Sequence, residues 1–233
     1  MLKSVYSEKQ LWDIVNRQML NFWPLDDLEG LYRWEIDEGG AIKNVWKRLE
    51  ICFSQNQSKY IKDGKDVIFA INHSVSYSIF LYILSNELYS QGYENSAAYV
   101  YYLNKIMHGV DWFYAVKLPD IFMAEHPVSS VLGRAVYQDY FMLYQGCTVG
   151  GNRKNNVLNY PVLGHHVLMF ANSTLLGNSH VGNYVVISAE TYIKDMDIPD
   201  YSIVFGKSPN IVIKKRTKEE MKKRFMSIWN INE

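Results

Sequence analysis

The 233-residue sequence has little cysteine, no net charge and no long apolar run. Two cysteines, Cys52 and Cys147, and no apolar signal core in residues 1–10 lead us to expect a reducing, cytoplasmic setting without a disulfide framework. Lys plus Arg and Asp plus Glu number 24 each, which excludes a global positive field for nucleic acid or anionic membranes. The longest apolar stretches fall short of the roughly 20 residues of a transmembrane segment, so none is expected.

Apolar side chains in the first half of the chain recur with helical spacing. Ser7 is the expected N-cap of a first helix, which should end before Trp23-Pro24 because a residue before proline avoids helical backbone. Residues 79–89 and 97–107 are predicted to form two further helices, separated at Gln91-Gly92. These features predict an α-helical N-terminal domain.

The second half of the chain has a different period. From residue 163 every sixth position carries an aliphatic side chain, with methionine counted as one: Leu163, Met169, Leu175, Val181, Ile187 and Ile193. Leu143 and Val149 show the same spacing before the polar segment that follows them. Each hexad makes one short strand and one turn, and three hexads close a triangular coil whose anchors stack inside it. The period therefore predicts a parallel β-helix. The alternative, a sandwich of short strands, would alternate with a period of two.

These periods divide the chain into an N-terminal domain at 1–108, a β-helix at 109–216 and a C-terminal helix at 217–233. The polar run at 150–159 interrupts the hexads, so we expect an exposed loop that leaves the column; the alternative is an insertion without function. Residues 203–213 should form one closing strand, and an amphipathic helix over 217–229 should cap the open end.

Motifs within these predicted domains resemble those of a known family. Val110-Asp111 is followed by Glu125-His126-Pro127, with His126 fifteen positions after Asp111. The run Tyr144-Gln145-Gly146-Cys147-Thr148-Val149-Gly150-Gly151 comes next. These segments resemble the serine acetyltransferases and their sugar-modifying relatives. The resemblance implies an α+β chain with a helical N-terminal domain and a left-handed parallel β-helix, assembled as a homotrimer that uses acetyl-CoA.

The resemblance also implies roles for three residues near the first coil. His126 would be the general base, because a neutral imidazole can take the proton of an attacking hydroxyl. Asp111 would hold the other ring nitrogen, and Glu125 would help to hold the acceptor. The alternative for His126 is a structural histidine before proline. His108 and His73 are expected to be structural or on the acceptor side.

Acetyl-CoA needs a groove for its pantetheine arm and cations for its phosphates. Small residues let the arm approach the backbone, and the last coils carry lysines, although these could equally form a solvated face. The predicted set is Gly150, Gly151, Ala171, Ser188, Lys207, Lys214 and Lys215. A backbone N–H of the Gly150-Gly151 region is the expected oxyanion donor.

The acceptor is expected to be a hydroxyl-bearing small molecule or saccharide. The predicted acceptor-binding residues are Asn72, His73, Ser76, Asn159 and Tyr160. Their groups are neutral, whereas the zwitterion of free serine needs charged partners when it is desolvated. We therefore favour a sugar over serine, with serine O-acetylation as the alternative.

Two further classes of protein are weighed against this prediction. A zinc hydratase on the same column would need three converging histidines, but His126, His165, His166 and His180 do not form the expected short cluster, so no metal is predicted. The other class is a non-catalytic trimeric scaffold, which would not bind acetyl-CoA.

Overall fold

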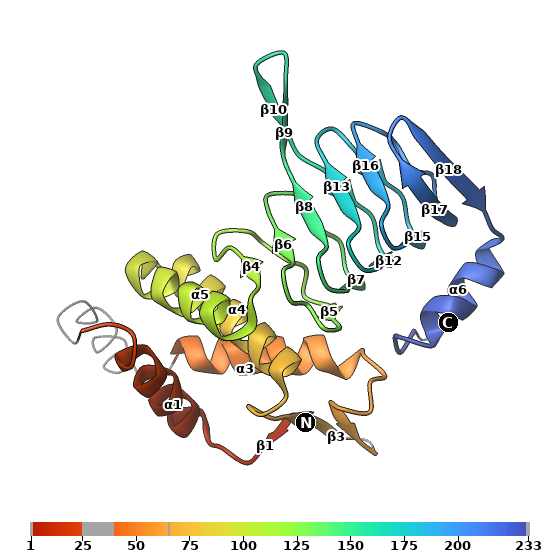
Figure 1. Cartoon of the computed structure of the whole chain (residues 1–233). Coiled ribbons are helices and arrows are strands. Elements are labelled where there is room, and N and C mark those ends of the chain that lie inside the picture. Colours follow the sequence, from red (N-terminus) through yellow and green to blue (C-terminus); the bar gives the residue numbers. More distant parts are fainter. Residues whose placement is uncertain (1, 25–39, 65, 232–233) are drawn as a thin grey trace.

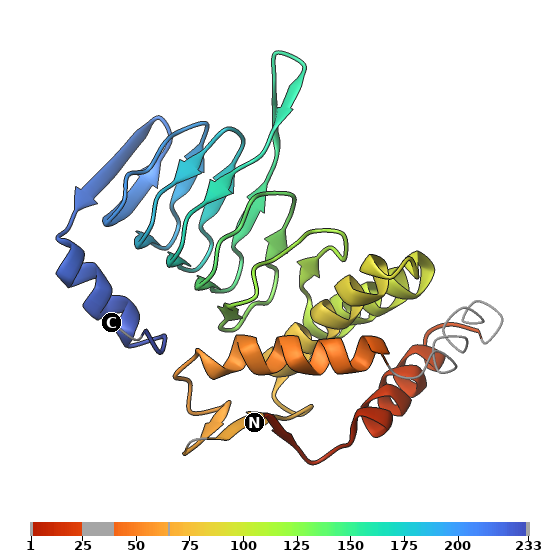
Figure 2. The same ribbon diagram turned by 180° about the vertical axis from the view of Figure 1, so that it is seen from behind.

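The computed structural model of the chain describes residues 2–24, 40–64 and 66–231. Parts of the predicted domains at residues 1, 25–39, 65 and 232–233 lie outside these residues. A helical N-terminal domain is followed by a column of short parallel strands, and a C-terminal helix returns along the column toward the first domain (Figures 1 and 2). The predicted fold class, helices followed by a β-helix, is confirmed.

The N-terminal domain contains the predicted helices and a small sheet that the sequence did not indicate. Ser7 caps the first helix with a capping box completed by Gln10, which satisfies exposed N–H groups of the first turn. The small sheet has the strand order β1-β3-β2. The elements are β1 (Leu2–Ser4), α1 (Glu8–Leu20), α3 (Gly40–Ser54), β2 (Lys62–Asp63), β3 (Asp66–Phe69), α4 (Ser74–Ser90) and α5 (Glu94–His108).

The column has three faces. One face has the strand order β5-β7-β12-β15-β17, a second has β4-β6-β8-β13-β16, and β11 pairs with β14 on the third. The strands are β4 (Asp111–Trp112), β5 (Phe122–Ala124), β6 (Val131–Leu132), β7 (Phe141–Leu143), β8 (Thr148–Gly150), β11 (Val162–Leu163), β12 (Val167–Met169), β13 (Thr174–Leu176), β14 (His180–Val181), β15 (Val185–Ile187), β16 (Tyr192–Lys194) and β17 (Ser202–Lys207).

The register of the strands shows the length of one coil. Val167 pairs with Val185 and Met169 with Ile187, so each residue lies beside the one that follows it by three hexads. All eight predicted anchors are buried, each at 3% exposure or less. Their stacking removes apolar surface from water along the whole column, at about 25 cal/mol for each Å².

A hairpin interrupts this register between the second and third coils. Leu175 pairs with Ile193 at the usual offset of three hexads, but Val149 pairs with Leu175, which lies more than four hexads further on. The extra chain forms β9 (Asn152–Lys154) and β10 (Val157–Asn159), joined at Asn155-Asn156, where both residues have left-handed backbone. The segment expected to be a loop is thus an antiparallel hairpin that projects from the column (Figure 1).

The end of the column differs from the prediction in two ways. The single closing strand expected over 203–213 is a hairpin of β17 and the antiparallel β18 (Asn210–Lys215). The C-terminal helix α6 (Lys218–Met226) is shorter than expected, and its Phe225 packs against the rings of His166 and Tyr184 on the side of the column. The strand β18 covers the last coil, so α6 is free to pack along the side.

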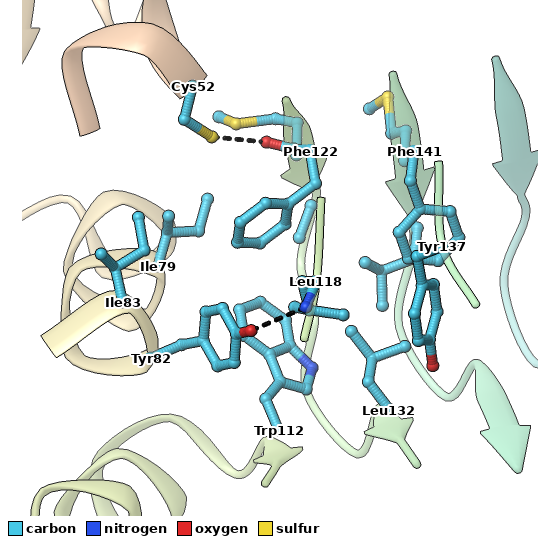
Figure 3. Close-up of a cluster of buried hydrophobic side chains, with 14 of the residues drawn as sticks. Cys52, Ile79, Tyr82, Ile83, Trp112, Leu118, Phe122, Leu132, Tyr137 and Phe141 are labelled. Carbon is cyan, nitrogen blue, oxygen red and sulfur yellow. Dashed lines mark hydrogen bonds between the residues drawn. The ribbon is translucent and has the colours of Figure 1, made fainter. Parts of the chain in front are cut away.

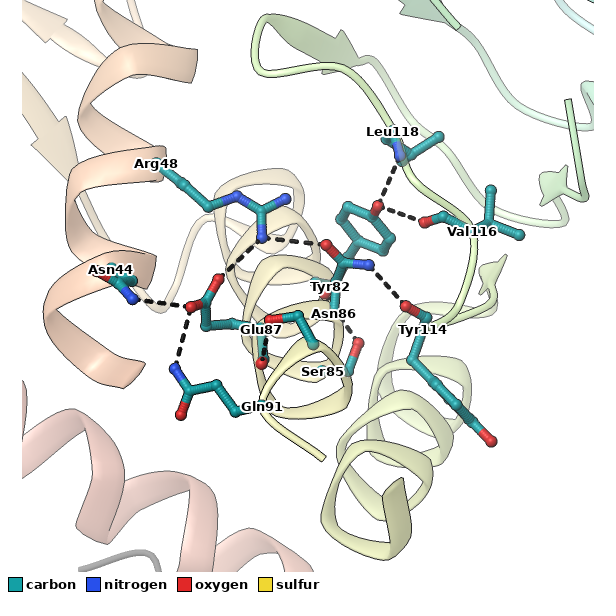
Figure 4. Close-up of polar contacts among 11 residues, drawn as sticks. Asn44, Arg48, Tyr82, Ser85, Asn86, Glu87, Gln91, Tyr114, Val116 and Leu118 are labelled. Atoms are coloured by element: carbon teal, nitrogen blue, oxygen red, sulfur yellow. Dashed lines mark hydrogen bonds and ion pairs between the residues drawn. The ribbon is translucent and has the colours of Figure 1, made fainter. Parts of the chain in front are cut away.

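The N-terminal domain and the first coil share a buried interface (Figure 3). The Cys52 thiol donates to the carbonyl of Phe122, and the Tyr82 hydroxyl donates to the carbonyl of Val116 and accepts from the N–H of Leu118. A polar network extends this interface, in which Arg48 contacts Asn86 and Glu87 and the Asn86 amide donates to Tyr114 (Figure 4). These bonds satisfy buried polar groups and fix the helices against the column.

Candidate active site

The coil corner after β5 places His126 at the surface beside the N-terminal domain. Glu125 donates its N–H to the carbonyl of Leu143 and continues the ladder, and Val128 donates to the carbonyl of His126 across a tight turn. The left-handed backbone of His126, with φ of 49°, recurs at other coil corners such as Asn172 and Glu190. The conformation is therefore a property of these corners, and it leaves the imidazole exposed.

A cavity of about 430 Å³ lies where this corner meets the N-terminal domain. The column contributes Met123, Ala124, Glu125 and His126, and the start of α4 contributes His73, Ser74 and Val75. The loop before β2 contributes Asn56, Ser58 and Tyr60. We call this cavity the acceptor pocket. It brings together three predicted site residues, namely His73, Glu125 and His126.

His73 is held in the pocket by one contact at the edge of its ring and one on its face. Its Nδ1 lies 2.6 Å from the hydroxyl oxygen of the buried Ser76, and its ring stacks on Tyr60 with 5.5 Å between centroids. Burial lowers the pKa of His73, which favours the neutral ring. Ser76, a predicted acceptor-binding residue, thus contacts His73 and is not itself at the pocket wall.

Glu125 has a tyrosine as its neighbour on the next coil. Burial, and to a smaller extent the nearby Glu125 carboxylate, raise the pKa of Tyr144 to about 12. The Tyr144 ring stacks on Phe170 one coil further, with 5.1 Å between centroids. The only carboxylate among the described residues of the pocket wall therefore has Tyr144 as its neighbour on the column.

The predicted bond between Asp111 and His126 is not formed. The Asp111 carboxylate accepts from the Tyr101 hydroxyl at 2.7 Å and from the Lys105 ammonium at 2.6 Å. Desolvation works in the opposite direction, but these two hydrogen bonds hold the pKa of Asp111 below its usual range. The α5 helix presents Tyr101 and Lys105 one turn apart, directly above β4, so they meet this carboxylate first.

The other predicted acceptor-binding residues do not line the pocket of the same chain. Asn72 is exposed just before α4. The Asn159 amide donates to the carbonyl of Val157 within the hairpin, and the Tyr160 ring lies under Arg134, 5.4 Å from its guanidinium carbon. The hairpin extends from the opposite edge of the column (Figure 1), so Asn159 and Tyr160 could reach an acceptor pocket only in another copy of the chain.

The predicted acetyl-CoA residues fall in three places. Ala171 and Ser188 lie at the corners that follow β12 and β15, on the same edge of the column as His126. Gly150 and Gly151 lie where the hairpin leaves β8, away from the acceptor pocket.

The three lysines are not gathered at one point. Lys207 pairs with Asn210 at one end of the terminal hairpin, whereas Lys214 and Lys215 pair with Ile203 and Ser202 near the other end. With about 3.3 Å per strand residue, these ends are separated by roughly 15 Å. The structure therefore does not bring the lysines together around one phosphate group.

The histidines that were weighed as zinc ligands with His126 do not converge on it. His180 contacts Asp197 at 3.1 Å on an exposed face, and His166 is buried between two tyrosine rings. Within residues 2–24, 40–64 and 66–231, no group of three His, Cys, Asp or Glu side chains is placed to hold a metal ion. None of the helices described has the length and apolarity needed to cross a bilayer.

One wall of the acceptor pocket could not be predicted from the sequence. Asn56, Ser58 and Tyr60 lie in the N-terminal half of the chain, far before His126, and carry no motif. Asn56 forms an isolated bridge with Trp229, and the Gln57 amide donates to the carbonyls of Met226 and Trp229. This loop is placed by the last residues of the chain, which no local pattern could indicate.

The coils of three short parallel strands, with buried aliphatic anchors and a helical domain at one end, define the class of hexapeptide-repeat β-helix proteins. Within this class, the chain is similar to the serine acetyltransferases. It is 26% identical to the enzyme of Staphylococcus aureus over 137 residues, which are 58% of this chain and 64% of that protein. The chain thus spans just under two thirds of that relative's length. No protein-family model matches the chain.

Two solved structures show the same fold. The crystal structure of the Neisseria gonorrhoeae serine acetyltransferase superposes with a TM-score of 0.68 and 19% identity, covering 94% of this chain and 84% of that chain. A serine acetyltransferase in complex with CoA gives 0.60 and 17%, covering 89% and 84%. The architecture, including the left-handed β-helix, is therefore that of the serine acetyltransferases.

Proposed function

We propose that the protein transfers the acetyl group of acetyl-CoA to a hydroxyl of a small molecule or saccharide, with His126 as the general base. The observation that carries the proposal is the acceptor pocket, in which the exposed imidazole of His126 lies beside Glu125 and His73. The similarity to serine acetyltransferases, and the CoA complex of one structural neighbour, support acetyl-CoA as the donor.

The reaction needs one base and no covalent intermediate. His126 takes the proton as the acceptor oxygen attacks the thioester carbonyl, so that a C–O bond forms. Collapse of the tetrahedral intermediate breaks the C–S bond, and the proton passes from His126 to the departing CoA sulfur. Ala171 and Ser188, small residues on the same edge of the column, leave room for the pantetheine arm.

Glu125 is the residue we assign to holding the acceptor. Its carboxylate can accept hydrogen bonds, and the Tyr144 hydroxyl lies near it on the next coil. We propose that it receives a hydroxyl proton of the acceptor near the attacking oxygen. Asp111 has no part in this scheme, because Tyr101 and Lys105 already occupy its carboxylate.

The composition of the pocket favours a saccharide as the acceptor. No Lys or Arg is among its described lining residues, so the carboxylate of free serine would lack a cation there. Asn, Ser, Tyr and His groups suit neutral hydroxyls. Serine is the second candidate, because the relative from Staphylococcus aureus is a serine acetyltransferase.

We also propose a homotrimer in which the hairpin of one copy approaches the acceptor pocket of another. Asn159 and Tyr160 would then join the site, and the Gly150-Gly151 backbone could supply the oxyanion donor. The exposed apolar residues Val157 and Leu158, at 59% and 43% exposure, would be covered by such a contact. Light scattering that gives a monomer would contradict this assembly.

The test is an assay of CoA release from acetyl-CoA with sugars, polyols and L-serine as acceptors. We expect transfer to at least one sugar or polyol, dependence on His126 and no dependence on His180, whose exposed ring is the matched control. Turnover with L-serine alone would select the second candidate. Failure of acetyl-CoA to raise the melting temperature would instead favour a non-catalytic scaffold.

A further inference from the structure

A second, smaller cavity also has His126 in its wall. It has a volume of about 200 Å³, and its wall includes His108, Met107, Pro127 and Val128. It shares Ser74 and His126 with the acceptor pocket. A molecule whose hydroxyl reaches His126 from the acceptor pocket can therefore extend a neighbouring group toward His108.

The hydrogen-bonding state of His108 is fixed by its surroundings. The amide nitrogen of buried Asn104 donates to the carbonyl of Ser78 at 2.9 Å, which sets the orientation of that amide. The Asn104 Oδ1 then lies 2.8 Å from Nδ1 of His108. Because a carbonyl oxygen only accepts, Nδ1 must carry the hydrogen.

The other ring nitrogen of His108 is therefore a hydrogen-bond acceptor. Burial lowers the pKa of His108 to about 4, so the ring is neutral at neutral pH and Nε2 keeps its lone pair. No described residue contributes a hydrogen bond to Nε2, and this atom is not among the side-chain atoms that are sealed from solvent without a partner. It is open to a donor that enters from outside.

We propose that His108 binds the acceptor through Nε2, which accepts a hydrogen bond from a second hydroxyl while the first hydroxyl gives its proton to His126. The acceptor class is then a polyol or sugar whose two hydroxyls lie close together. This inference rests on the proposed function. The ammonium group of serine could supply the same hydrogen bond, so the experiment includes both kinds of donor.

Two variants separate this role from a structural one. His108→Asn keeps an amide group at the position of Nδ1, within reach of Asn104, but has nothing at the position of Nε2. His108→Gln places an amide at the position of Nε2 and gives up the bond to Asn104. We expect His108→Asn to raise the KM for the acceptor about tenfold, because one hydrogen bond is lost. His108→Gln should bring the KM most of the way back to the wild-type value. A structural role predicts the reverse order.

The hydroxyl is identified by combining the variants with deoxy sugars. CoA release is measured with the sugars and polyols of the acceptor panel, with single-deoxy analogues of the best acceptor among them, and with L-serine. With the wild-type enzyme, one deoxy analogue of the best acceptor should have a KM about tenfold above that of the parent sugar. His108→Asn should raise the KM of that analogue no further. If serine is instead the acceptor, His108→Asn should raise its KM.

The outcomes distinguish the two proposals. Wild-type KM and kcat in His108→Asn for every acceptor that is used, or additive losses for every deoxy analogue, would overturn the role of His108 alone. Full activity of His126→Ala, or no acceptor at all in the panel, would overturn the proposed function and this inference with it.

Discussion

Two regions of the molecule bury an imidazole in different ways. In the cavity beside the acceptor pocket, His108 has one nitrogen bonded to Asn104 and the other open. On the far corner of the column, His166 lies between the rings of Tyr140 and Tyr184, with centroids 4.2 and 4.1 Å away and planes within 9°. Neither nitrogen of His166 has a hydrogen-bond partner among the described residues.

Burial lowers the pKa of both histidines to about 4, yet only one of them is placed to bind a ligand. His166 serves as a flat ring in a stack that continues from Tyr184 to Tyr201 and is covered at its edge by Phe225. A lowered pKa therefore reports desolvation in both regions. What separates a site from a packing position here is an open nitrogen next to a cavity.

The largest effect that would test this contrast is expected at His126. His126→Ala should lower turnover by about 10² to 10⁴, because proton transfer from the acceptor loses its base. His166→Ala, the comparison in the other region, should lower stability and leave turnover of the folded enzyme near wild type. Steady-state kinetics and thermal melting of both variants measure this. Near wild-type turnover in His126→Ala would mean that the histidine in the acceptor pocket matters no more for turnover than the stacked His166.

The second effect concerns acid stability. The folded protein keeps His166 neutral down to about pH 4, with His165 and Lys222 adding to the effect of burial, whereas the unfolded chain takes up the proton near pH 6.5. This contribution to the free energy of unfolding is present above pH 6.5 and is lost as the pH falls toward 4. It amounts to about 3 kcal/mol.

His166→Phe keeps a flat ring in the stack and removes the titration. Urea unfolding at pH 7 and pH 4.5 should therefore show a smaller loss of stability in the variant than in the wild type. His180→Gln, a change on an exposed histidine, serves as the control. Equal losses in the wild type and His166→Phe would mean that the stack does not exclude the proton.

A smaller effect is expected where the column supports the pocket. Tyr144→Phe removes the hydroxyl beside Glu125 but keeps the ring on Phe170. The acceptor KM should rise about fivefold to tenfold, the cost of one hydrogen bond to a charged group that becomes less well placed. Unchanged kinetics would show that Glu125 is positioned without the tyrosine. A melting temperature within a few degrees of wild type would confirm that packing is intact.

The smallest effect is expected at Asp111. Its ion pair with Lys105 is partly exposed, with side-chain exposures of 33% and 45%, and such pairs contribute less than about 1 kcal/mol. Asp111→Asn should therefore reduce stability slightly and turnover by less than about threefold. A loss of turnover beyond a hundredfold would show that Asp111 reaches His126 during catalysis and would restore the partner role.

The parts of the molecule that could be predicted are those in which each residue packs against the equivalent residue of the neighbouring coil. The anchors from Leu143 to Ile193 are buried because the same contact recurs with every coil of three hexads, so a local period is enough. The polar run at 150–159 marked the break in that period. Glu125 and His126 were predicted because their segment resembles the catalytic segment of the serine acetyltransferases, and His73 was predicted from the stretch before α4.

The parts that could not be predicted depend on contacts between distant segments. Spacing placed Asp111 within one coil of His126, but not the face of α5 that carries Tyr101 and Lys105 over its carboxylate. The proposed role of His108 depends on Asn104 and Ser78, which lie on two helices and together fix the tautomer of its ring. No motif connects these residues, because only the packing of α4 against α5 brings them together.

The bridge between Asn56 and Trp229 has a consequence for the order in which the protein matures. The Gln57 amide donates to the carbonyl of Trp229, near the far end of the chain, and the Asn230 amide donates to the carbonyl of Ser54. A nascent polypeptide that has reached Arg216 already contains every coil, yet the acceptor pocket still has one unanchored side. Competence to recognise a ligand would then arise only after every coil of the scaffold has been made.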